Sequence, residues 1–167
     1  DGPRVLEYNC RFGDPETQSV LPLVDGDLLA ALSAAASGSL AGVDLGRVPG
    51  AAVTVALVAG DYPSAGDRGT AIEGIADAEA AGALVFHAGT ALNDGRLVTN
   101  GGRLLGVTAT GQTLAEARSS AYAAAAPRFT DLNALSLFPL ARYRNDLPTS
   151  RAAEYFAPPR TFTGQFL

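Results

Sequence analysis

The sequence has no lysine and no methionine, and it holds a single cysteine, Cys10, and a single histidine, His87. Because all 12 basic residues are therefore arginines and the net charge is -5, no basic stripe for nucleic acid is indicated. One cysteine excludes an internal disulfide and fits a reducing compartment, so we expect a cytoplasmic protein. No apolar run approaches the roughly 18 residues of a membrane helix, and no signal-peptide pattern opens the chain. Neither nucleic acid nor a membrane is a predicted partner.

The composition is that of a folded domain. The 167 residues are 47% hydrophobic and 17% charged, which lies in the globular range and allows a buried core. Methionine is missing from the first position too, and the chain opens directly on a segment with functional side chains. We therefore expect a fragment of a longer protein.

That opening segment, residues 5–11, is predicted to be a strand. Side chains alternate faces along a strand, so Glu7, Asn9 and Arg11 share one face and Cys10 lies on the other, as a small buried apolar residue. A carboxylate and an amide oxygen two residues apart can both ligate a hard cation such as Mg²⁺, with the arginine beside it to hold a carboxylate or phosphate. An ordinary edge strand facing water explains the same alternation.

A stiff polar loop follows, GDPETQ at residues 13–18. Asp14 is suited to cap a helix that has Pro15 at its first position, which would be a structural role. Glu16 has no comparable structural explanation, so it is a candidate for binding a substrate.

The rest of the chain alternates quickly between short elements. A helix is predicted over residues 20–36, with Asp27 as a cap and Gly38 as a stop, and residues 38–50 read as a crossing into a second module. A three-strand antiparallel meander is predicted over residues 90–108, because its turns are rich in Asn, Asp and Gly. The remaining predictions are strands at 51–60, 70–75 and 83–87, a helical turn at 77–81, and a helix from the capping box at Thr113 to Ala126.

The segment EYNCRFGDPETQ resembles the late catalytic strand of the ATP-grasp ligases, and in particular that of the phosphoribosylamine-glycine ligase family. The segments GDYP, VFHAGT, LVTNGGRLLGVTATG and TLAEARSSAYA resemble the carboxy-terminal domain of the same family. The resemblance covers about residues 3 to 126, in the order of the family. The last residues, 127–167, depart from it and hold five prolines, so they are expected to be irregular.

The resemblance implies an α+β fold, with the end of an ATP-grasp domain followed by a small mixed or antiparallel β module with helices. Residues 1–48 would be the carboxy-terminal part of the catalytic domain, 49–126 the β-rich domain, and 127–167 an atypical tail. The implied partners are glycine, 5-phosphoribosylamine, ATP and the missing amino-terminal part of the same enzyme.

The resemblance also assigns roles to single residues. Glu7 and Asn9 would hold Mg²⁺ or Mn²⁺, and Arg11 would be catalytic. Asp14 and Glu16 would bind the amine-bearing substrate or glycine. Arg103, after the glycines of the NGGR segment, is either a substrate-binding residue or a surface arginine after a plain hairpin turn.

Two other functions are compatible with these residues. The chain can be an accessory or interaction module that keeps only a remnant of an active site, or part of an ATP-grasp ligase for another amino acid. The GDPETQ, HAGT and NGGR segments together disfavour the second of these.

The chain by itself is expected neither to hydrolyse ATP nor to bind it tightly. It has no lysine, no phosphate-covering glycine-rich loop and no adenine-binding hinge, which the family supplies from upstream. Titration calorimetry with Mg-ATP tests this expectation, and micromolar affinity would refute it.

Overall fold

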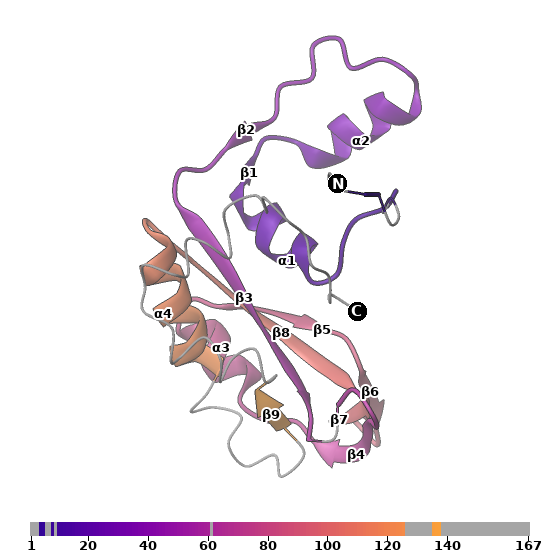
Figure 1. Cartoon of the computed structure of the whole chain (residues 1–167), viewed down its shortest axis with the longest axis vertical. Coiled ribbons are helices and arrows are strands. Elements are labelled where there is room, and N and C mark those ends of the chain that lie inside the picture. The colour runs from indigo at the N-terminus through magenta and orange to yellow at the C-terminus, as the bar shows by residue number, and fades with distance from the viewer. Residues whose placement is uncertain (1–3, 6–7, 9, 61, 126–134, 138–167) are drawn as a thin grey trace.

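The computed structural model describes residues 4–5, 8, 10–60, 62–125 and 135–137. Across these residues helices combine with antiparallel sheets, so the predicted α+β class is confirmed. Figure 1 shows the long strands crossing the centre of the molecule, with helices beside them and a smaller sheet at one end.

The central sheet has four strands in the order β5-β8-β3-β9. Its axis is the antiparallel pair of β3 (Ala51–Ala59) and β8 (Arg103–Gly111), flanked by β5 (Leu84–His87) and β9 (Leu135–Leu137). Small and β-branched side chains in β3 suit a strand that is buried between neighbours. The strand β9 corrects the expectation that residues 127–167 are irregular throughout, since Leu-Ser-Leu pairs with the edge of β3.

One face of this sheet carries the main core. Helix α4 (Leu114–Ala125) lies along β3 and β8, and helix α3 (Ile75–Ala80) packs beside it against β5 (Figure 1). Alanines fill the helix side of this interface, which lets the helix backbones approach the sheet closely. The buried residues are Val55, Leu57, Ile72, Ala78, Ala83, Leu105, Val107, Ala109, Ala121, Ala124 and Ala125.

The smaller sheet has the order β4-β7-β6. Its strands are β4 (Asp67–Ala71), β6 (Thr90–Asn93) and β7 (Arg96–Gly101). Asp94 and Gly95, both at positive φ, form the two-residue turn between β6 and β7, so the predicted hairpin is confirmed. The predicted strand from Arg103 to Thr108 exists as part of β8, but β8 pairs in the central sheet, so the prediction of a three-strand meander is wrong.

Glycines allow the chain to pass from β7 in the smaller sheet to β8 in the central sheet. A Cβ on Gly89 would lie 2.6 Å from the Arg103 carbonyl oxygen, and a Cβ on Gly66 would lie 2.7 Å from the Gly101 carbonyl carbon. The amide of Gly89 donates to the Arg103 carbonyl at 2.7 Å. Backbones that approach this closely leave no room for a side chain, so the HAGT and NGGR segments meet glycine against glycine.

The predicted helix over residues 20–36 is wrong in its first half. The chain instead forms α1 (Glu16–Val20), the 3-10 helix η1 (Leu21–Leu23), β1 (Val24–Asp25) and then α2 (Leu28–Ala36). Pro22 cannot donate a helical hydrogen bond, and Gly26 has a φ of 124°, so these two residues interrupt the helix. Two predicted signals at α2 are confirmed: the Asp27 carboxylate accepts from the Ala30 amide at 2.9 Å, and Gly38 has a φ of 77°.

The predicted strand over residues 5–11 is absent from its described residues, Val5, Tyr8, Cys10 and Arg11. Tyr8 is 81% exposed, and Cys10 is exposed, which corrects its predicted burial. A strand needs a partner for its backbone, and the two-stranded sheet nearby pairs β1 with β2 (Gly46–Arg47) instead.

Two other elements have bounds that differ from the predictions, and the predicted start of α4 is confirmed. The strand expected at 70–75 is β4, which ends at Ala71, and the helical turn expected at 77–81 is α3, which starts at Ile75 after Gly74 with a φ of 89°. The capping box of α4 is confirmed, because the Thr113 hydroxyl accepts from the Glu116 amide and the Glu116 carboxylate accepts from the Thr113 amide.

The close approach of the Gly89 backbone to the Arg103 carbonyl predicts that a side chain at residue 89 destabilises the fold. Gly89→Ala should lower the free energy of unfolding by about 1–3 kcal/mol, because backbone atoms cannot yield to the new methyl group. Gly46→Ala is the matched control, since its Cβ would meet Asp25 only at 3.5 Å. Urea unfolding of both variants measures the difference, and equal stabilities would contradict the close approach.

Candidate functional site

The short helix α1 carries the GDPETQ loop and is fixed to the sheet by a chain of hydroxyl groups. Ser19 Oγ lies 2.6 Å from Thr54 Oγ1 on β3, which lies 2.7 Å from Thr108 Oγ1 on β8. Thr54 and Thr108 are direct cross-strand partners, and both lie on the face opposite the main core because side chains alternate. Thr108 is fully buried. This contact is not predicted from the sequence, although threonine within an otherwise apolar strand is a visible signal of it.

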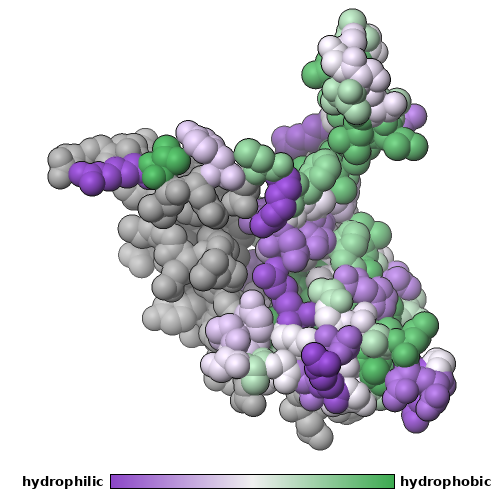
Figure 2. All heavy atoms as spheres, turned by 90° about the vertical axis from the view of Figure 1, so that its right-hand side faces the viewer, coloured by the Kyte–Doolittle hydropathy of each residue, from purple (hydrophilic) through white to green (hydrophobic). Residues whose placement is uncertain are grey.

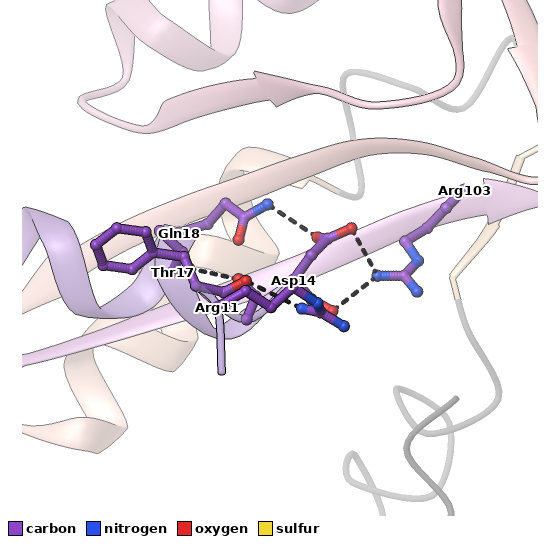
Figure 3. A network of polar contacts seen from close by, with 7 residues as sticks. Arg11, Asp14, Thr17, Gln18 and Arg103 are labelled. Carbon is purple, nitrogen blue, oxygen red and sulfur yellow. Dashed lines mark hydrogen bonds and ion pairs between the residues drawn. The ribbon is translucent and has the colours of Figure 1, made fainter. Parts of the chain in front are cut away.

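The second attachment joins the loop to the start of β8. Arg103 Nη1 lies 3.3 Å from Asp14 Oδ2 and donates to the Asp14 carbonyl at 3.3 Å (Figure 3). Gln18 Nε2 donates to Asp14 Oδ1 at 3.0 Å, one helical turn away. Two of the predicted substrate-binding residues, 89 positions apart in the chain, are thus brought together.

This arrangement corrects the predicted role of Asp14 as a helix cap. The N-cap position of α1 is Pro15, and no side chain caps it. Asp14 instead accepts from Gln18 and pairs with Arg103, while its side chain stays 59% exposed. Its carboxylate is therefore reachable from solvent.

Glu16 stands in the first turn of α1, and its side chain is exposed. It folds back over Gly13, whose missing Cβ would collide with the Glu16 carboxylate. The Thr17 hydroxyl donates to the Gly13 carbonyl (Figure 3). The loop is thus held in a tight turn that leaves two carboxylates, Asp14 and Glu16, open to solvent.

Arg11 lies before this turn and is exposed, with its guanidinium donating to the neighbouring Phe12 carbonyl at 3.0 Å. Figure 3 draws it in one view with Asp14, Thr17, Gln18 and Arg103. Its side chain makes no ion pair among the described contacts, so it can turn toward an anionic ligand.

The predicted metal ligands, Glu7 and Asn9, lie outside the described residues. Within residues 10–60, 62–125 and the other described positions, no group of three or more His, Cys, Asp or Glu side chains could hold a metal ion. The metal site therefore stays a prediction from the sequence.

Polar contacts in the smaller sheet are structural. The Thr99 hydroxyl donates to Asp67 Oδ2 at 2.6 Å and accepts from the Thr70 amide at 3.0 Å. Hydrogen bonds from Thr99 and then Thr70 hold the pKa of Asp67 below its ordinary value of 3.8. The contact therefore stabilises the fold above that value and is lost as the pH falls through the lowered pKa.

His87 is exposed and has a structural partner. Its Nδ1 lies 3.1 Å from the Thr90 hydroxyl at the turn between β5 and β6. This hydrogen bond agrees with a structural role at the end of a strand.

The comparisons with known proteins agree with this fold. Residues 52–149 match the family model described as phosphoribosylglycinamide synthetase, C domain. The phosphoribosylamine–glycine ligase of Mesorhizobium japonicum is 48% identical over 123 residues, which are 74% of this chain and 29% of that protein. The corresponding ligase of a Synechocystis species is 51% identical over 122 residues, again 29% of its length.

The comparison with solved structures points to the same family as the sequence comparisons. The crystal structure of phosphoribosylamine–glycine ligase from Thermotoga maritima superimposes with a TM-score of 0.63 at 40% identity, covering 72% of this chain and 29% of that one. The chain belongs to the phosphoribosylglycinamide synthetase C-domain family. It spans less than a third of the length of these ligases. No helix within the described residues is long and apolar enough to cross a membrane.

The pair of Arg103 and Asp14 is partly exposed, so we expect it to contribute little to stability. Arg103→Gln should lower the free energy of unfolding by about 0.2–1 kcal/mol, and the loss should shrink at high salt. Arg96→Gln at the exposed start of β7 is the control. Denaturant unfolding at low and high salt measures both, and a loss well above this range would make Arg103 a structural residue.

Proposed function

We propose that this chain is the carboxy-terminal part of a ligase that joins glycine to 5-phosphoribosylamine at the expense of ATP. The products are glycinamide ribonucleotide, ADP and phosphate, in purine biosynthesis. The observation that carries the proposal is that 48% of 123 aligned residues are identical to those of an enzyme of that name.

The reaction has two steps. A carboxylate oxygen of glycine takes the γ-phosphoryl group of ATP, which gives an acyl phosphate and ADP. The amine nitrogen of 5-phosphoribosylamine then attacks the acyl carbon, the bond to the phosphate oxygen breaks, and phosphate leaves. The protein must hold the amine near the acyl carbon and stabilise the negative charge that develops.

In this proposal the exposed carboxylates of the loop bind the acceptor. Asp14 and Glu16 are suited to an amine and to ribose hydroxyls, which are hydrogen-bond donors. Arg103 keeps Asp14 in place and offers its remaining N–H groups to a phosphate. Arg11, whose guanidinium contacts only its neighbour's carbonyl among the described contacts, would stabilise the acyl phosphate.

Glu7 and Asn9 are proposed as ligands of Mg²⁺ or Mn²⁺ on the chemistry of their side chains, because both metals prefer oxygen ligands. A bound metal would neutralise charge on the phosphoryl group. We also propose that the enzyme uses ATP as a co-substrate and lies in the cytoplasm. The boundary between its catalytic domain and its β-rich domain is proposed at residue 48.

The acceptor role of Glu16 can be tested in a chimera in which this chain replaces the aligned segment of the Mesorhizobium ligase. Glu16→Gln should raise the KM for 5-phosphoribosylamine or slow amide formation, and it should leave the affinity for ATP nearly unchanged. Steady-state kinetics with each substrate measures these effects.

A structural role for Glu16 predicts a different result. A carboxylate at the start of a helix would contribute about 0.3–1 kcal/mol to stability and nothing to the kinetics. The melting temperature of the same variant, with Glu79→Gln as an exposed carboxylate control, separates the two roles. Reduced stability with unchanged acceptor kinetics would rule out the assignment.

A further inference from the structure

The side chain of Gln18 has one polar atom with a hydrogen-bond partner and one without. Its Nε2 donates to Asp14 Oδ1 at 3.0 Å. Its Oε1 is buried, and no group in the described part of the chain donates to it. A buried carbonyl oxygen without a donor lowers the stability of a fold. The amide is therefore an unfavourable choice for the packing of α1 against the sheet.

The orientation of this amide is set by Asp14. An ionised carboxylate only accepts hydrogen bonds, so Gln18 must turn its NH2 group toward Asp14 and its oxygen away. Turning the amide over would bring Oε1 against the Asp14 carboxylate. The unpaired Oε1 is thus a consequence of the hydrogen bond that Nε2 makes.

A hydrogen bond between a glutamine and an aspartate four residues apart also occurs as a plain stabiliser of helices. In that role it is weak, and weaker than the effect of an unsatisfied buried oxygen. Asp14 moreover lies outside α1, which begins at Glu16 after Pro15. The contact therefore fixes a residue of the loop and not the helix itself.

The Asp14 carboxylate is held by a different donor on each oxygen. Gln18 donates to Oδ1, and Arg103 Nη1 lies 3.3 Å from Oδ2 (Figure 3). Arg103 also donates to the Asp14 carbonyl, so the backbone is held as well as the side chain. Two donors on separate oxygens restrict the rotation of the carboxylate, yet the side chain stays 59% exposed. The remaining lone pairs are therefore open to a ligand in a fixed direction.

The surface around this carboxylate is polar. In Figure 1 the loop before α1 and the start of β8 lie on the right-hand side of the molecule. Figure 2 looks at that side and shows hydrophilic side chains gathered along it. A ligand with hydrogen-bond donors suits such a surface.

We propose that Gln18 is a positioning residue, which fixes the Asp14 carboxylate for the acceptor of the ligase reaction and does not stabilise the fold. The inference rests on the proposed function. The Oε1 of Gln18 is buried, so it does not meet the acceptor. Gln18 acts through Asp14, whose free lone pairs bind the amine or the ribose hydroxyls of 5-phosphoribosylamine.

Gln18→Met tests this role, because methionine has a similar length but neither the donor nor the buried oxygen. In the chimera described above it should lower kcat/KM for 5-phosphoribosylamine by about tenfold or more and leave the affinity for ATP nearly unchanged. In the 167-residue chain it should leave the melting temperature unchanged or raise it, because the unsatisfied oxygen is gone. Gln112→Met is the matched control, since Gln112 is exposed and follows the end of β8 opposite to Arg103. It should leave both the kinetics and the melting temperature unchanged.

A second comparison shows whether Gln18 acts through Asp14. In a chimera that already carries Asp14→Ala, Gln18→Met should have little further effect on kcat/KM. Equal fold-changes in the two backgrounds would overturn the inference, because Gln18 would then act independently of Asp14. A melting temperature lowered by about 2 °C or more would also overturn it, since Gln18 would be a structural residue.

Failure of the proposed function gives a different outcome. An active chimera whose acceptor kinetics are unchanged by Gln18→Met would contradict only the role of Gln18. A chimera that makes no glycinamide ribonucleotide, whether folded or not, would contradict the proposed function, and the role of Gln18 would fall with it.

Discussion

The contact between Ser19 and Thr54, continued to Thr108, decides where the candidate site lies. Burying the Thr108 hydroxyl without a partner would cost about 1–3 kcal/mol, and a net hydrogen bond returns about 0.5–1.5 kcal/mol. Thr54 gives the Thr108 hydroxyl its partner within the strand pair. Ser19, at the other end of the chain of hydroxyls, fixes α1 to the sheet. The exposed pair of Asp14 and Arg103 positions the loop but contributes little to the free energy of folding.

The sheet therefore does two separate tasks with its two faces. One face buries Val55, Leu57 and Val107 under α3 and α4, which supplies the hydrophobic free energy of folding. The other presents Thr54 to α1, which carries Asp14 and Glu16. A rigid strand pair is thus placed directly behind a loop of exposed carboxylates, as a binding site requires.

Much of the fold follows from local signals in the sequence. The turn at Asp94-Gly95, the capping box of α4 and the cap at Asp27 were predicted because each depends on residues within a few positions. Pro22 and Gly26 are the local signals of the break before α2, whereas the helical spacing of the leucines favours one continuous helix. The membership of β8 in the central sheet could not be predicted locally, because the turn NGG fits a hairpin equally well. The pair of Asp14 and Arg103 depends on the same long-range geometry.

The attachment of α1 is tested most directly by a double-mutant cycle between Ser19→Ala and Thr54→Val, measured as the free energy of unfolding of the 167-residue chain. The structure predicts a coupling free energy of about 0.5 kcal/mol or more, because each variant removes the same hydrogen bond. Thr110→Val on the same face of β8, paired with Ser19→Ala, should be additive. Additive effects of Ser19→Ala and Thr54→Val would contradict the account, since α1 and its loop would then not be held by the sheet.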